Sequence, residues 1–442
     1  MERIKKFFKI EERGSSIKVE LIGGLTTFLT MAYILFVNPA IMSGYGGIPI
    51  DGGAIFLATA LTAGLATIAM GLFAKLPIAL APGMGLNAFF AFTVVMGMGY
   101  SWEEALAAVL VSGILYLIIS VTGLRAKVVA AIPQSLKYAI GAGIGFFIAY
   151  IGLVNVGIIE QGVGTPTTLG DLSNPVALLA LFGIVLTIAL LAFKVRAAVF
   201  FGLVGTAIVG LIVGLFGVAN MPALPSFTGA LPSLAPTFGK AFTGIAGLLS
   251  SAGGWFAVFA FLFVDFFDTS GTLMAVTGQM ENVTEEDLQK ANIVDSSATV
   301  VGAVLGTSTT TSYIESLSGV GAGARTGLAS VFTGFLFILS IFLAPLLSLV
   351  TAGVTAAAMV IVGTMMAASI GKIEWDKWPI AMASFITILV MILTYSISDG
   401  IGFGFLTYIL VMLASRRSKE VSPLLYGVGV FFILYLVLMT IM

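Results

Sequence analysis

The sequence predicts an all-α polytopic membrane protein with fourteen transmembrane segments arranged as two inverted repeats. Of its 442 residues, 59% are hydrophobic and only 9% are charged, against roughly 25% charged in a soluble domain. Apolar stretches of about 20 residues, long enough to cross a bilayer as helices, recur almost from end to end. A Pro/Gly-rich stretch over residues 218–245 divides them into two similar halves.

The first half begins with residues 1–17, which predict an amphipathic lead-in, because their basic residues are not followed by an uninterrupted apolar run. The first repeat then covers residues 18–217. Its expected spans are 18–38, 54–74, 78–98, 102–122, 134–158, 175–193 and 197–217.

The second repeat covers residues 246–415, after the 218–245 linker. Its expected spans are 246–278, 289–305, 307–321, 324–344, 351–370, 376–396 and 399–415. Residues 416–442 add a basic loop and a last apolar segment that either crosses the membrane or lies in its interface. Because each half has an odd number of spans, the two halves have opposite orientations.

Basic residues in alternate loops orient these spans. Lys75, Lys194, Arg325, Lys372 and Arg416 all fall on one side when the spans are counted from the N-terminus. Loops rich in Lys and Arg stay in the cytoplasm, so we expect a cytoplasmic N-terminus in a cell membrane.

The third span of each repeat is expected to be broken. Residues 77–92 and 306–323 each open with residues that form helices poorly and then become a short helix. Non-helical backbone at membrane depth is tolerated where it is buried in protein or lines a cavity. Asn87 and Glu315 take comparable positions near the starts of the two short helices, which points to a polar site between them.

Three carboxylates stand where a membrane disfavours charge. Asp265 and Asp268 lie within a long apolar run, and Glu315 follows a block of hydroxyl residues at 307–312. Such residues usually line a solute or ion pathway. Asp265 and Asp268 are three apart, so they project from one side of a helix. Either one could carry a proton, and the other could be a helix-end or hydroxyl-paired structural residue.

The composition excludes several kinds of chemistry. The chain has no cysteine and no histidine, which removes disulfides, thiol catalysis, His-based zinc sites and Ser-His-Asp triads. We expect no metal and no cofactor, and the net charge of −1 gives no sign of a nucleic-acid partner. Proton chemistry therefore falls to Asp, Glu, Tyr or Lys.

Other polar and aromatic residues permit two interpretations. Thr30 and Ser312 could bind a solute, but hydroxyls in helices often bond to their own backbone. Phe89 could stack on a flat ring, although most of the 34 phenylalanines must face lipid or core. The glycine run at 141–145 is expected to permit close packing between helices.

Four motifs carry a resemblance to a known family. GGLTTFLTMAYILFVNP (23–39), APGMGLNAFFAF (81–92), FLFVDFFDTSGTL (261–273) and GTSTTTSYIES (306–316) resemble the AzgA-like purine permeases of the nucleobase/ascorbate transporter superfamily. The similarity is greatest to bacterial guanine/hypoxanthine permeases, and other members move adenine. The resemblance implies proton-coupled uptake of purine bases, alternating access and often a homodimer. It also implies a core domain of spans 1–4 and 8–11 and a gate domain of spans 5–7 and 12–14.

The resemblance also suggests individual residues. In the related uracil permeases, an acid on span 8 and a glutamate on span 10 bind the base. These roles carry over to Asp265 or Asp268 and to Glu315. The uracil permeases use a histidine one turn after the span 8 acid, where this chain has Thr269. The substrate-binding set predicted on this basis is Glu315, Asp265, Asn87, Tyr313, Gly85, Thr30, Phe89 and Ser312, and the proton-coupling set is Asp265, Asp268 and Glu315.

A carboxylate fits a purine base chemically, because it accepts two N–H bonds side by side. Guanine offers its ring N1–H and 2-amino groups as such a pair, whereas hypoxanthine offers its ring N–H groups singly. The competing interpretations are an anion carrier or channel, which would need positive lining, and an intramembrane aspartyl protease. Asp265 and Asp268 lie on one helix and no GxGD stretch occurs, which disfavours the protease.

Overall fold

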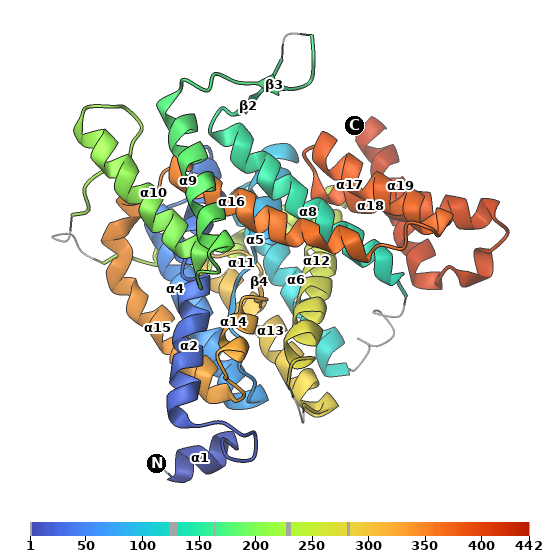
Figure 1. Ribbon diagram of the computed structural model, residues 1–442. Coiled ribbons are helices and arrows are strands. Elements are labelled where there is room, and N and C mark those ends of the chain that lie inside the picture. The colour runs from blue at the N-terminus through green and yellow to red at the C-terminus, as the bar shows by residue number, and fades with distance from the viewer. Residues whose placement is uncertain (1, 123–130, 163, 227–230, 281–282, 442) are drawn as a thin grey trace.

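The computed structural model describes residues 2–122, 131–162, 164–226, 231–280 and 283–441 and is mostly helical (Figure 1). In the first half the helices are α1 Glu2–Phe8, α2 Ile17–Met31, α3 Ile34–Met42, α4 Gly52–Ala69, α5 Met84–Ala88, α6 Trp102–Thr122, α8 Gln134–Asn155, α9 Pro175–Ala192 and α10 Ala198–Leu215. In the second half they are α11 Lys240–Leu249, α12 Ala252–Thr277, α13 Glu285–Leu305, α14 Ser316–Gly321, α15 Gly327–Leu339, α16 Ala352–Ala367, α17 Trp378–Leu393, α18 Ile397–Ala414 and α19 Pro423–Ile441.

Within these described ranges, 10 helical stretches are long and apolar enough to cross a membrane. The predicted polytopic helical class is therefore confirmed, whereas the count of fourteen stays a prediction. Several expected spans are divided in the structure. The expected span 246–278 begins only at α12, because a separate short helix, α11, ends at Leu249. The expected span 18–38 breaks between α2 and α3.

Both expected broken spans are present. Strand β1 (Leu80–Pro82) precedes α5, and strand β4 (Thr310–Ser312) precedes the short helix α14. The two strands, one from each half, pair antiparallel with Ala81 opposite Thr311. All six strand residues are buried, so each strand satisfies backbone groups of the other that water cannot reach.

Helices from both halves enclose this strand pair. Helix α4 contacts β1, α12 and α13 contact β4, and α14 packs on α2; Figure 1 shows β4, α5 and α14 near the middle of the molecule. A further group of helices packs together, with α16 against α8 and α9, and α17 against α8 and α18. A small hairpin, β2 (Ile159–Glu160) with β3 (Thr168–Leu169), lies between α8 and α9.

Glycines allow the closest of these helix contacts. At Gly145 of α8, an added Cβ would lie 2.5 Å from the Gly363 carbonyl oxygen on α16. At Gly363 an added Cβ would lie 2.4 Å from the Gly145 carbonyl oxygen. Each backbone therefore occupies the space that a side chain of the other would need, as expected for small residues between membrane helices.

The N-terminal lead-in folds back onto the ends of other elements. Arg13 donates to the carbonyl oxygens of Lys75 (2.9 Å) and Arg325 (3.2 Å). It also lies 3.5 Å from the Asp287 carboxylate, and only 9% of its side chain is exposed. One arginine thus joins the end of the second predicted span, the segment after α14 and the start of α13.

Candidate functional site

The predicted carboxylates and their hydrogen-bond partners gather around the paired strands. Asp265 and Asp268 come from α12, and Glu315 directly precedes α14. Because β4 is extended, its residues alternate between two sides and offer hydroxyls and backbone groups to more than one helix. The strand pair therefore acts as the frame that brings the distant acidic residues together.

Glu315 lies at the accessible part of this cluster and is half-buried. Its Oε1 accepts a hydrogen bond of 2.8 Å from the hydroxyl of Tyr33, which stands at the break between α2 and α3. Asp268 is exposed and lies near enough for its charge to interact with that of Glu315. These two carboxylates are the acidic groups of the cluster that solvent reaches.

Asp265 faces the interior instead and is 1% exposed. Its Oδ2 accepts a hydrogen bond of 3.0 Å from Thr299 of α13, and the same hydroxyl lies 2.8 Å from the carbonyl oxygen of Thr310. The Asp265 Oδ1 atom is buried and has no hydrogen-bond partner among the described residues. The two aspartates were predicted to project from one side of the helix. In the structure Asp268 is exposed, whereas Asp265 is enclosed.

A fourth carboxylate, Asp295 of α13, belongs to the same cluster and was missed by the sequence analysis. It is fully buried and accepts hydrogen bonds from Ser312 (2.7 Å) and Thr269 (2.8 Å). Its charge interacts with that of Asp265. Thr269 therefore links α12 to α13 and, through a 2.9 Å contact with Thr311, to β4.

Asn87 of α5 is also fully buried. Its Oδ1 accepts a hydrogen bond from Ser308, just before β4. Its Nδ2 is buried without a partner in the described part of the chain. An unpartnered buried donor is costly, so this amide is available to a solute or a water that reaches the strand pair.

The remaining predicted residues make mainly structural contacts. Thr30 donates to the carbonyl oxygens of Thr26 (2.9 Å) and Thr27 (2.8 Å) on its own helix. The ring of Phe89 is buried edge-on against Phe261, with centroids 4.7 Å apart.

Tyr313 and Gly85 make contacts that hold the strand pair and α5 in place. Tyr313 is buried, and its hydroxyl donates to the Pro82 carbonyl oxygen at 2.5 Å. Gly85 admits Ile144 of α8, because a Cβ there would lie 2.4 Å from the isoleucine side chain. Contact of these residues with a substrate stays a prediction.

The cluster holds acidic groups without basic partners. Among the described residues, no lysine or arginine forms an ion pair with Asp265, Asp268, Asp295 or Glu315. Buried carboxylates that are ionised and unpaired are very costly, so the enclosed pair Asp265 and Asp295 is suited to hold a proton. No grouping in the described ranges has the three ligands that a metal ion requires.

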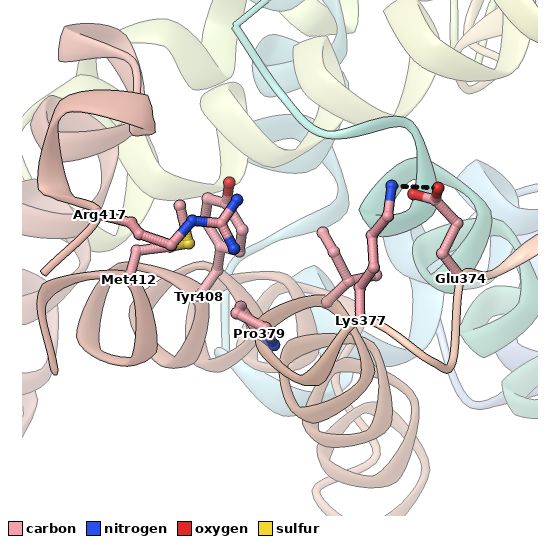
Figure 2. A pocket seen from close by; sticks show the side chains of 7 residues that line it. Glu374, Lys377, Pro379, Tyr408, Met412 and Arg417 are labelled. Carbon is pink, nitrogen blue, oxygen red and sulfur yellow. Dashed lines mark hydrogen bonds and ion pairs between the residues drawn. The ribbon is translucent and has the colours of Figure 1, made fainter. Parts of the chain in front are cut away.

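A surface pocket elsewhere offers different chemistry. Its cavity of about 160 Å³ lies by the start of α17 and the end of α18 (Figure 2) and is lined by Glu374, Lys377, Pro379, Ile380, Tyr408, Met412 and Arg417. Lys377 pairs with Glu374 at 2.5 Å, and this hydrogen bond lowers the pKa of the Glu374 carboxyl. Both lysine and arginine there already have carboxylate partners.

Comparison with known sequences matches the chain to a described family. Residues 18–439 match the Permease family. The chain is 49% identical to the guanine/hypoxanthine permease PbuG of Bacillus subtilis, over 98% of this chain and 99% of the relative. It is 38% identical to the adenine permease AdeQ of Escherichia coli, over 98% and 96%. These relatives are permeases and not enzymes.

Solved structures share the fold at low sequence identity. The transmembrane domain of the cyanobacterial bicarbonate transporter BicA superposes with a TM-score of 0.61 at 16% identity, over 90% of this chain and 97% of that one. The murine anion transporter Slc26a9 in its inward-facing state gives a TM-score of 0.63 at 12% identity, over 93% and 72%. The predicted inverted-repeat transporter fold is thereby confirmed.

Proposed function

Because the chain belongs to the Permease family, we propose that it carries the purine bases guanine and hypoxanthine across the cell membrane together with protons. The observation that supports this most is the 49% identity to a guanine/hypoxanthine permease over nearly the whole chain. Adenine is the alternative substrate, favoured by the 38% identity to an adenine permease.

Glu315 is the proposed base-binding residue. It is half-buried, so a base that enters the cluster can reach its carboxylate while losing most of its water. Carboxylates accept N–H donors side by side, and hydrogen bonds to charged groups contribute about 1.5–3 kcal/mol each. Asn87, with its unpartnered Nδ2, would donate to a ring nitrogen or carbonyl of the same base.

The enclosed pair Asp265 and Asp295 is the proposed proton carrier. Both are buried, their charges interact, and their hydrogen-bond partners are neutral hydroxyls. Two like charges in such a place disfavour each other, so a shared proton relieves the repulsion. Protonation from outside would favour base binding, and proton loss inside would release the base.

Transport would proceed by movement of a core against a gate. The proposed core joins α2, α4, α6, α12, α13 and α15 with the two strands, and the proposed gate joins α8, α9, α10, α16, α17 and α18. Their internal packing supports this division, with α15 against α2 and α4 and with α16 against α8 and α9. A cytoplasmic N-terminus and a homodimer belong to the same proposal.

The Asp265→Asn variant tests the proton role in proteoliposomes. Asparagine keeps an oxygen for the Thr299 hydroxyl but cannot gain or lose a proton. We expect gradient-driven accumulation of hypoxanthine to be lost while exchange of labelled for unlabelled base continues. Met274→Leu is the matched control, because Met274 is 65% exposed on the same helix. Unchanged proton-driven uptake in the Asp265→Asn variant would remove Asp265 from the mechanism.

A further inference from the structure

Tyr33 comes from a break in the first predicted span. Helix α2 ends at Met31 and α3 begins at Ile34, and the side chain of Tyr33 between them is 1% exposed. Within α3, Pro39 has no N–H to give to the carbonyl oxygen of Leu35. Tyr33 keeps helical backbone angles (φ −58°, ψ −29°), and its side chain lies in the protein interior.

The hydroxyl of Tyr33 forms a hydrogen bond with Glu315, the proposed base-binding residue. It donates to Glu315 Oε1 at 2.8 Å, although the two residues are 282 positions apart. In the described part of the chain, it is the one side chain that donates a hydrogen bond to Glu315. The buried tyrosine therefore holds one oxygen of a carboxylate on a half-buried residue.

Holding one oxygen fixes the plane of the carboxylate. The terminal torsion of a glutamate is broad and has no sharp preferred value, so an untethered carboxylate turns freely. A base with one N–H can follow such rotation, because either oxygen can accept its bond. A base with two adjacent N–H groups needs both oxygens in the plane of its ring.

We propose that Tyr33 is a positioning residue that sets the preference for bases with two adjacent N–H donors, by orienting the Glu315 carboxylate toward them. This inference rests on the proposed function. It assigns discrimination between guanine and hypoxanthine to a hydroxyl that does not touch the base.

The test compares the two bases in the Tyr33→Phe variant, which keeps the ring and removes only the hydroxyl. Labelled hypoxanthine uptake into proteoliposomes gives its KM and maximal rate, and unlabelled guanine as competitor gives its inhibition constant. We expect the guanine constant to rise ~10-fold, equivalent to about 1.4 kcal/mol. The hypoxanthine KM should change by less than about threefold. The maximal rate of hypoxanthine uptake should stay close to that of the wild type.

Tyr116→Phe is the matched control, because it removes another buried hydroxyl, whose O–H donates to Asn292 Oδ1 at 3.1 Å. It should leave the ratio of the guanine and hypoxanthine constants unchanged. Glu315→Asp is a second variant, which draws the carboxylate back from the hydroxyl and should also lower the guanine preference.

The outcomes separate the two proposals. Suppose that the wild type takes up both bases and that the ratio of the guanine inhibition constant to the hypoxanthine KM is unchanged in Tyr33→Phe and in Glu315→Asp. That result would overturn the proposed role of Tyr33 and leave the proposed function standing. A wild-type protein that takes up neither base would overturn the proposed function and this inference with it.

Discussion

The contact between Gly145 and Gly363 makes a quantitative prediction for the Gly145→Ala variant. The new Cβ would lie 2.5 Å from the Gly363 carbonyl oxygen and 2.7 Å from the Ala367 nitrogen. Both are backbone atoms, so neither can turn aside and α8 and α16 must separate. Overpacking of this kind typically costs about 1–3 kcal/mol, which exceeds the roughly 1 kcal/mol that alanine gains over glycine in a helix.

Gly141→Ala is the control one turn earlier on the same helix. There the nearest atom to an added Cβ is the Ser369 hydroxyl at 3.6 Å, an ordinary van der Waals contact. The same chemical change should therefore be neutral or slightly stabilising. The pair separates the clash from the general effect of replacing glycine by alanine.

Thermal unfolding of the purified protein in detergent measures the difference. We expect Gly145→Ala to unfold lower than wild type by on the order of a few °C and Gly141→Ala to unfold at or above wild type. Equal midpoints for the two variants would refute the reasoning, because they would mean that α8 and α16 are not in close contact at Gly145.

Three further predictions follow from buried polar contacts. Asp295→Asn should lose proton-driven accumulation, as Asp265→Asn does, because the pair can no longer hold a shared proton; normal accumulation would restrict the proton to Asp265. Arg13→Ala should lower stability by on the order of 3 kcal/mol, because two charged hydrogen bonds to carbonyls are lost, whereas the exposed Lys6→Ala should unfold like wild type. Glu20→Gln should also lower the unfolding temperature, because the buried Glu20 carboxylate accepts hydrogen bonds from two backbone N–H groups at the start of α15. An unchanged unfolding midpoint in Arg13→Ala or in Glu20→Gln would contradict the stabilising role of the contact that the variant removes.

Hydropathy predicted the polytopic helical class and the two broken segments, because lipid requires long apolar helices and makes exceptions to them conspicuous. Asp265, Asp268 and Glu315 stood out for the same reason. Asp295 did not, because α13 begins with the charged stretch 285–290, and a later acid continues the pattern of its polar end. An acid between Val294 and Ser296 at the middle of that helix is the signal that could have identified it.

Contacts between distant residues could not be predicted from the sequence. The hydrogen bond from Tyr33 to Glu315 joins residues 282 positions apart, and hydropathy carries no information about which distant residues meet. The hydroxyls were ambiguous because Thr and Ser bond equally well to their own helix or to a partner. In the structure Thr30 bonds to its own helix, whereas Ser312 bonds to Asp295.

Uptake of labelled hypoxanthine into proteoliposomes under an imposed inward proton gradient tests the central claim most directly. We expect concentrative uptake that collapses with a protonophore and is competed by guanine but not by adenine. For one proton per base, the accumulation ratio should rise about tenfold for each pH unit of gradient. Competition by adenine alone would assign the chain to adenine, and no uptake of any purine base by the folded protein would contradict the account.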